Sequence, residues 1–336
     1  MRRVIVGLIS GLLTLALVGA LGLSWALWTY QGPGPEAKGG AKNHVVILRR
    51  GAGLNEIASA LEKGGAVRSA AVFVAAAQLT GAARSLKAGE YEFPSRASMA
   101  TVLDYIRDGR VVVHQVTIPE GWTVDMAVEA LMKEEALVGE VATPPEGSIL
   151  PQTYAFERGE ERAAVLQRMM DARDKLLADL WPKRKAGLPI RTPEEAIILA
   201  SIVEKETGQT SERPRVAAVF VNRLNKGMRL ESDPTIIYGL TKGRPLGRGI
   251  RCSELDRPNP YSTYQIDGLP PTPIANPGEA SIAAVLDPPD TDELFFVADG
   301  TGGHVFATTL EEHNRNVARW RQVEAERKAA APATGD

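Results

Sequence analysis

The stretch ILASIVEKETG, residues 198–208, is an apolar helical run that ends in two carboxylates. Before it, Thr192 can cap a helix, Pro193 suits the first helical position and Glu195 completes a capping box. After it, Gly208 is a natural helix stop. Because the run between these signals is apolar nearly all round, we predict a helix buried in the core of a domain.

Glu204 and Glu206 stand at the end of this predicted helix. Residues two apart on a helix point in different directions, so the two carboxylates are not expected to form a facing pair. An ionised carboxylate is costly to bury without a partner. Two interpretations are open: both are solvated charges at a helix end, or one is a half-buried acid whose pKa is tuned for catalysis.

Length and composition limit the classes of function. The chain has 336 residues, of which 44% are hydrophobic and 24% charged, which is typical of a globular protein with two or three domains. A formal net charge of −2 gives no electrostatic indication of nucleic-acid binding. The single cysteine, Cys252, excludes a disulfide framework within the chain, and the four histidines lack zinc-binding spacing. We therefore predict neither a metal nor a cofactor.

The N-terminus predicts a membrane anchor. Arg2 and Arg3 precede an uncharged stretch that reaches Trp28, and about 20 apolar residues span a bilayer as a helix. The basic flank predicts a cytoplasmic N-terminus, with the rest of the chain on the periplasmic side of the cytoplasmic membrane. A cleaved signal peptide is the alternative, although no A-x-A site follows. We assign residues 1–30 to the anchor and the Gly- and Pro-rich residues 31–43 to a flexible linker.

Residues 44–140 are predicted to form a small α+β module. Segments 45–61 and 116–131 repeat a pattern of short strand, glycine turn and helix, and Ser98 caps a further helix. The repeated pattern is similar to LysM domains, and this resemblance implies binding of glycans that contain N-acetylglucosamine. A plain structural module that positions its neighbour is the alternative.

Residues 141–328 are predicted to form a second, larger α+β domain that contains the buried helix, with a disordered tail at 329–336. Residues 228–280, dense in Pro, Gly and Tyr, are expected to be irregular and functional. The fold class is therefore α+β, with an N-terminal transmembrane helix. Further elements are expected over 161–181 (helix), 213–225 (helix), 280–286 (helix), 294–309 (hairpin) and from 309 to about 327 (helix).

A series of short motifs carries a resemblance to a known family. In chain order they are ILASIVEKETG, VAAVFVNRL, LESDPTIIYG, YSTY, GLPPTPIANPG, FFVADGTGGHVF and EEHN. The chain resembles the YceG-like family of endolytic murein transglycosylases over essentially its whole length. The resemblance implies a membrane-anchored lyase that cleaves peptidoglycan strands internally and leaves 1,6-anhydro-N-acetylmuramic acid ends. It also implies control of nascent strand length beside the cell-wall synthesis machinery, such as penicillin-binding proteins.

The resemblance implies that Glu204, the first glutamate of SIVEKE, is the catalytic acid of a YceG-like catalytic domain. One glutamate can protonate the glycosidic oxygen and then remove the proton of the C6 hydroxyl of muramic acid, which attacks its own C1. Burial would raise the pKa of such an acid and keep it protonated. For Glu206 we expect a support or salt-bridge role.

Two positions depart from the usual motifs of the family. Glu231 stands where glutamine is usual and adds a charge, and Ser262 stands where asparagine is usual. For each supporting residue, contact with the glycan and a bracing role are both open. The predicted substrate-binding residues are Asn222, Glu231, Asp233, Tyr238, Tyr261, Tyr264 and His304, with Arg223, His313 and Asn314 as further candidates.

Two other functions compete with the transglycosylase. A catalytically silent peptidoglycan-binding scaffold would use the LysM-like module alone. A hydrolase would use Glu231 or Asp233 to activate water, as glycosidases with two carboxylates do. The end of the product separates these hypotheses, because only a lytic transglycosylase leaves an anhydro end.

Overall fold

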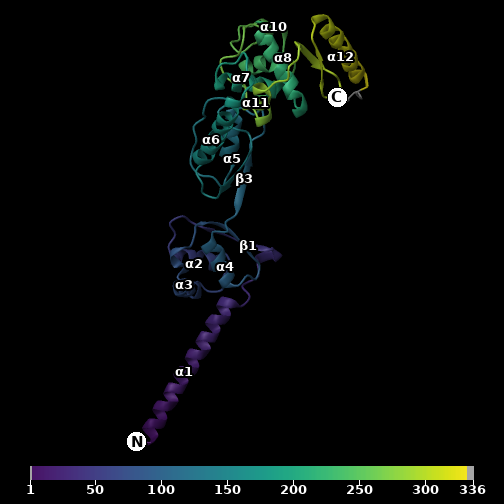
Figure 1. The fold of residues 1–336 in the computed structure, drawn as a ribbon. Coiled ribbons are helices and arrows are strands. Elements are labelled where there is room, and N and C mark those ends of the chain that lie inside the picture. Colours follow the sequence, from purple (N-terminus) through teal and green to yellow (C-terminus); the bar gives the residue numbers. More distant parts are fainter. Residues whose placement is uncertain (1, 331–336) are drawn as a thin grey trace. The chain divides into compact units, whose positions relative to one another are not determined.

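A computed structural model describes residues 2–330, with side-chain surroundings for residues 9–327. The predicted mixed α+β class is confirmed (Figure 1). The chain forms two compact units, Met1–His114 with Ala155–Glu160 and Gln115–Tyr154 with Glu161–Asp336. The short 3-10 turns are η1 (Lys38–Gly40), η2 (Ala82–Arg84), η3 (Trp181–Lys183) and η4 (Thr210–Glu212).

The first unit is a two-stranded sheet covered by short helices. Strand β1 (Asn43–Leu48) pairs antiparallel with β2 (Gly89–Pro94), and alternate residues of both strands point into the core. The fully buried rings of Phe73, Tyr91 and Phe93 fill that core. The helices of this unit are α1 (Arg2–Gln31), α2 (Leu54–Lys63), α3 (Ala70–Leu79) and α4 (Met99–Asp108).

Helix α1 contains a segment, Ile9–Gln31, that is long and apolar enough to cross a membrane, and none of its hydrophobic window is buried within the described part of the chain. A single-pass anchor and a signal sequence both have these properties. The side chains of the basic flank, Arg2 and Arg3, lie outside the residues whose surroundings are described.

The predicted flexible linker, residues 31–43, is wrong for its first half. Arg68 donates from Nη2 to the carbonyls of Pro33 at 3.0 Å and Gly34 at 3.3 Å. The N–H of Gly34 donates to the carbonyl of Arg96 at 3.0 Å, and the N–H of Arg96 donates to that of Pro35 at 2.9 Å. Composition alone predicted a flexible segment, but backbone groups paired with the module leave it little freedom.

The second unit is built around α7 (Pro193–Glu206), which packs against α8 (Arg213–Asn225) and α11 (Glu279–Leu286). The predicted N-cap is confirmed, since the hydroxyl of Thr192 accepts from the N–H of Glu195 at 3.2 Å. Leu199, Ile202 and Val285 are fully buried in the shared core.

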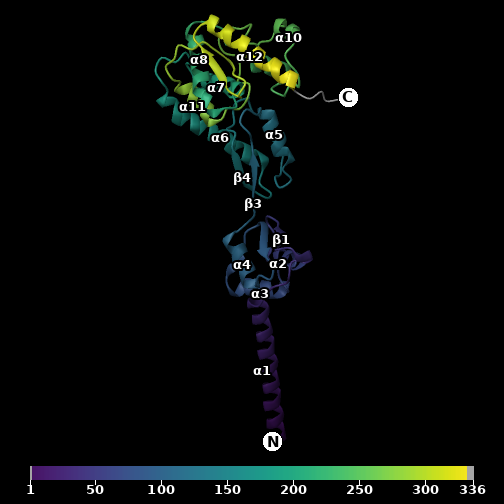
Figure 2. The same ribbon diagram turned by 90° about the vertical axis from the view of Figure 1, so that its right-hand side faces the viewer.

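The remaining elements of the second unit cover this core. The predicted hairpin is confirmed as β5 (Phe295–Ala298) paired antiparallel with β6 (His304–Ala307), and both strands contact α12 (Leu310–Ala330) (Figure 2). The predicted tail at 329–336 begins within α12, and its part beyond Ala330 lies outside the described residues.

One predicted domain boundary differs from the structure. The module predicted over 44–140 ends near His114, because α5 (Val124–Lys133) belongs to the second unit. There the guanidinium of Arg162, on α6 (Arg162–Leu180), donates to the carbonyls of Leu131 at 2.8 Å and Gly139 at 2.7 Å. Strands β3 (Val113–Thr117) and β4 (Thr153–Glu157) form a two-stranded sheet.

Residues 228–280 are less irregular than predicted. They contain α9 (Asp233–Thr241) and the short α10 (Cys252–Asp256). The prolines and glycines that indicated a loop lie mostly between these helices, and Pro234 occupies the first turn of α9, where a missing N–H costs nothing.

Candidate active site

Glu204 is enclosed by hydrogen-bond donors at the end of α7, and its side chain is only 4% exposed. One oxygen accepts from Nη2 of Arg213 at 2.9 Å. The other accepts from the N–H of Gly278 at 3.0 Å and from the hydroxyl of Ser281 at 2.7 Å. A buried carboxylate that faces a cation and two further donors is fully paired, and removing a partner is costly. Glu204 therefore braces α7 against α8 and α11.

Arg213 extends this network to the segment that precedes α5. Its Nη2 also donates to Glu120 at 2.7 Å, and its side chain is 6% exposed. Lys205 donates to the carbonyl of Gly121 at 3.3 Å, and the N–H of Gly121 donates to the carbonyl of Asn276 at 3.0 Å. The end of α7 is thus fixed to a segment that lies far away in the sequence.

Glu206 has different surroundings. It is half-buried, and its carboxyl accepts a short hydrogen bond from the hydroxyl of Ser232. Burial raises the pKa of Glu206 to about 7; the Ser232 hydrogen bond opposes this, the charge of Asp233 adds to it, and His304 and Arg223 oppose it. A large fraction of the Glu206 carboxyls is therefore protonated near neutral pH, and a general acid must be protonated to act.

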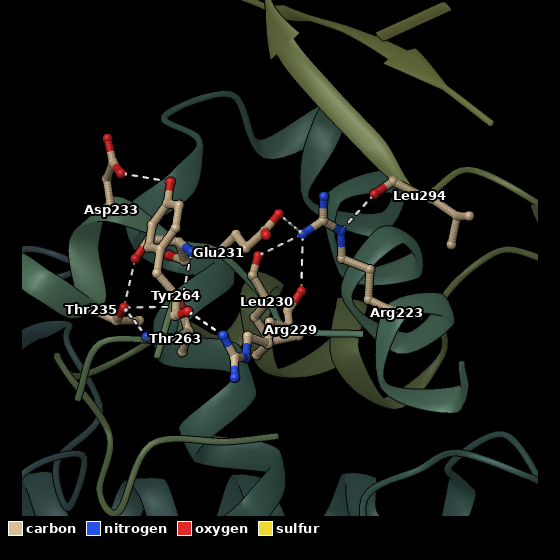
Figure 3. Close-up of polar contacts among 10 residues, drawn as sticks. Arg223, Arg229, Leu230, Glu231, Asp233, Thr235, Thr263, Tyr264 and Leu294 are labelled. Carbon is tan, nitrogen blue, oxygen red and sulfur yellow. Dashed lines mark hydrogen bonds and ion pairs between the residues drawn. The ribbon is translucent and has the colours of Figure 1, made fainter. Parts of the chain in front are cut away.

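The side chains beside Glu206 come from the start of α9 and from the segment around Tyr264, and these two segments bind each other. The hydroxyl of Tyr264 donates to Asp233 at 2.9 Å (Figure 3). Below them, the N–H of Ser232 donates to the Thr263 hydroxyl at 2.9 Å, and the hydroxyls of Thr235 and Thr263 lie 3.0 Å apart. Burial and the charge of Asp233 raise the pKa of Tyr264, so its phenol stays a donor. The motifs SDPT and YSTY thus form one polar wall.

Glu231, at the departure from the usual motif, has a defined partner. Its carboxylate accepts from Nη1 of Arg223 at 3.0 Å while its side chain stays 49% exposed. The same guanidinium donates to the carbonyls of Arg229 at 3.0 Å, Leu230 at 3.2 Å and Leu294 at 2.6 Å (Figure 3). Glu231 also has a positive φ of 52°. Arg223 is therefore a bracing residue, and Glu231 is its half-exposed carboxylate partner.

His304 lies at the start of β6, after the glycine-rich turn. Its Nδ1 lies 2.8 Å from a carboxylate oxygen of Glu212, and its backbone N–H donates to the other oxygen at 2.8 Å. The ring also packs edge-on against Phe296. His313 stacks on the ring of Phe295, at 5.1 Å between centroids. Glu212 and Phe296 therefore hold the His304 ring in place, whereas His313 is a packing residue.

Asn222, predicted to bind the substrate, contacts the segment before β5 and not the two glutamates. Its side-chain amide donates to the carbonyls of Thr291 at 2.7 Å and Glu293 at 3.0 Å. Asn222 is not among the donors to Glu204, which are Arg213, Gly278 and Ser281. Asn222 instead holds the segment before β5 on α8.

Tyr238 and Tyr261 belong to the core rather than to the polar wall. Tyr238 is 7% exposed and donates to Glu146 at 3.3 Å. The two rings meet edge-on with centroids 4.9 Å apart, and the hydroxyl of Tyr261 lies 3.0 Å from that of Thr272. Of the three tyrosines predicted to contact the glycan, only Tyr264 lies beside Glu206.

Sequence reasoning missed the hydrogen-bond partners that give Glu204 and Glu206 different surroundings. Ser232 and Ser281 are at most 1% exposed, and Arg213 is 5% exposed. A serine within the apolar run SIAAVL was a usable signal, because a buried hydroxyl needs a partner. Across residues 2–330 no group of three or more histidine, cysteine or acidic side chains is placed to hold a metal ion.

Comparison with known proteins identifies the family. The model of the YceG-like family matches residues 46–319. The endolytic murein transglycosylase of Streptococcus pneumoniae serotype 2 is 29% identical over 92% of this chain, which spans 64% of that protein. The endolytic murein transglycosylase of Bacillus subtilis is 26% identical over 80% of this chain and 82% of its own length.

A solved structure agrees with these sequence matches. The crystal structure of a YceG-like protein from Listeria monocytogenes has 28% sequence identity and a TM-score of 0.50, and the match covers 82% of this chain and 99% of that one. The family model covers most of the chain, including α7, the polar wall and the β5–β6 hairpin. The chain therefore belongs to the YceG-like family.

Proposed function

We propose that this protein is an endolytic murein transglycosylase with Glu206 as its catalytic acid. Two relatives carry that name, and Glu206 is a half-buried carboxyl with a pKa of about 7. That raised pKa is the observation that carries the proposal, because a carboxyl with an ordinary pKa is almost fully ionised where such an enzyme works. This assignment differs from the sequence hypothesis, which chose Glu204.

The contacts of the two glutamates support this choice. Glu204 is ion-paired with Arg213 through one oxygen and accepts from Gly278 and Ser281 through the other, so both of its oxygens are already occupied. Glu206 has one hydroxyl donor and lies beside the wall formed by Asp233 and Tyr264. Glu204 acts as a positioning residue that fixes the end of α7, from which Glu206 projects.

The reaction needs only one carboxyl. Glu206 gives its proton to the oxygen between N-acetylmuramic acid and N-acetylglucosamine, and the bond from that oxygen to C1 of the muramic acid breaks. The Glu206 carboxylate then takes the proton of the C6 hydroxyl as that oxygen bonds to C1. The product ends in 1,6-anhydro-N-acetylmuramic acid, no water is consumed, and the acid is restored. Attack within one sugar benefits from high effective molarity.

The remaining expectations belong to the same proposal. Helix α1 anchors the chain in the cytoplasmic membrane, with both compact units on its periplasmic side. Asp233, Tyr264 and His304 lie near Glu206, and together with Glu231 they bind the glycan. The first unit binds N-acetylglucosamine. The enzyme ends the growth of nascent strands beside penicillin-binding proteins.

The test is digestion of purified peptidoglycan by the full chain in detergent, with products read by mass spectrometry. We expect internal fragments with anhydro ends from the wild type and none from Glu206→Gln, which keeps the shape but cannot donate the acid proton. Glu204→Gln is the matched control on the same helix. It should reduce activity through misplacement and weaken folding, whereas Glu206→Gln should leave folding intact at neutral pH.

The alternatives give different results. Products with free reducing ends would establish a hydrolase. Glycan binding without cleavage by a folded wild-type protein would establish the scaffold. Loss of cleavage in Glu204→Gln with full folding, together with retained cleavage in Glu206→Gln, would return the catalytic role to Glu204.

A further inference from the structure

Helix α3 in the first unit has an uncharged, exposed face. The helix, AAVFVAAAQL, carries no charged residue, and Phe73 and Ala77 are buried against the core. Ala71, Ala75 and Leu79 are exposed at helical spacing along the opposite side. Leu79 is 88% exposed, more than any described leucine of α1. A helix face turned to water normally carries charged side chains, so this face is better suited to an apolar surface.

The helix lies where α1 joins the module. Helix α1 contacts α3 and α4, and Figures 1 and 2 both show α3 at the α1 end of the module. The guanidinium of Arg68, just before α3, lies over the ring of Trp28 at 5.2 Å. Thr29 is 5% exposed, and Tyr30 packs against the core that contains Phe73. The exposed face of α3 is thus held close to the end of the apolar segment of α1.

The segment that connects α1 to β1 is itself bound to the module. Arg68 donates to the carbonyls of Pro33 and Gly34, and the N–H of Ala37 donates to the Ser95 hydroxyl at 3.0 Å. His44 contacts the carbonyl of Pro35 at 3.1 Å. A module attached in this way follows the end of α1 instead of moving away on a tether.

The charges around α3 fit the headgroup region of a bilayer. Arg68 and Arg84 are exposed and flank the uncharged stretch on both sides. Glu62 accepts from the N–H of Ala70 at 3.0 Å, so its charge is directed to the first turn of the helix. Apolar helices with basic flanks bind membrane interfaces by burying the apolar face and pairing the basic groups with anionic lipids.

We propose that α3 lies in the interface of the membrane that α1 crosses, with Ala71, Ala75 and Leu79 toward the acyl chains. Arg68 and Arg84 then face anionic lipid headgroups. The inference rests on the proposed role of α1 as an anchor. It gives the first unit a fixed orientation on the membrane surface, in addition to its attachment through α1.

The test uses the full chain in nanodiscs that contain phosphatidylglycerol. Cys252→Ser removes the only cysteine, which is exposed. In this background Leu79→Cys receives an environment-sensitive fluorophore, and emission and quenching by nitroxide-labelled lipid are measured. Val45→Cys is the matched control, because Val45 is an exposed apolar residue of the same unit, 55% exposed on β1. Leu21→Cys reports on α1.

We expect a blue-shifted, lipid-quenched signal at position 79, a water-like signal at position 45 and strong quenching at position 21. The shift at position 79 should diminish when Arg68→Glu and Arg84→Glu are added, or in discs of neutral lipid. Quenching at 21 with a water-like signal at 79 would overturn the interfacial helix and leave the anchor intact. A water-like signal at both 21 and 79 would overturn the anchor and the interfacial helix with it.

Discussion

The pH dependence of glycan cleavage tests the role of Glu206 directly. Burial raises the pKa of this carboxyl from 4.5 to about 7. At pH 7 roughly half of the Glu206 carboxyls are then protonated, against roughly 0.3% for an unshifted group, a gain of about 150-fold in acid. The shift corresponds to roughly 3 kcal/mol between the two protonation states, and partial exposure of Glu206 makes this an upper figure.

We expect kcat/KM to be nearly constant below about pH 6 and to fall about tenfold per pH unit well above about pH 7, because only the protonated acid can donate. The assay is the initial rate of release of anhydro-ended fragments by the full chain across this range, at constant ionic strength. A rate that stays level well above pH 7 would refute the assignment, as would a Glu206→Gln variant with the wild-type rate.

Folding stability gives a second readout of the same carboxyl. The folded state has the higher pKa, so between about pH 4.5 and about pH 7 it binds more protons than the unfolded state. Stability should therefore fall as the pH rises through this window and stay level on either side. Urea unfolding should show this fall in the wild type but not in Glu206→Gln. The same pH dependence of the unfolding free energy in both proteins would contradict the raised pKa of Glu206.

Three further substitutions test the surrounding structure. Arg213→Met leaves Glu204 buried without its cation and should cost about 3–5 kcal/mol of folding free energy, measured by urea unfolding. Gly147→Ala should destabilise by about 1–3 kcal/mol in the same measurement, because φ is +75° and the new Cβ would lie 2.6 Å from Cγ of Pro273. Glu231→Gln should change stability by less than about 1 kcal/mol and keep near wild-type cleavage, since Arg223 retains its carbonyl partners; a large loss of cleavage would instead give the charge of Glu231 a catalytic role.

The local signals of the sequence predicted the elements well. The cap at Thr192 and the apolar run placed α7, and the glycine-rich turn placed the β5–β6 hairpin. These features depend on neighbours a few residues away, which periodicity and capping rules describe. The family was also predictable, because its motifs are short and specific, and the comparison confirms it.

The division of roles between the two glutamates was not predictable from the same signals. Periodicity predicted that Glu204 and Glu206 point in different directions, but it did not predict which residues surround each carboxyl. The donors to Glu204 come from Arg213, Gly278 and Ser281, and the donor to Glu206 is Ser232. Such partners depend on tertiary packing. Tertiary packing also holds the first half of the predicted linker against the module and makes α5 part of the second unit.

The path of the chain through its two compact units limits how the protein can be divided. The chain passes from the first unit to the second after His114, returns at Ala155 and leaves again after Glu160. Neither unit is therefore a continuous segment, and no single cut releases either one whole. A fragment that starts at residue 141 would also lack Glu120 and Gly121, which hold the end of α7. Cloning, limited proteolysis and recombination thus act on both units together, unlike in proteins whose binding modules are exchangeable along the chain.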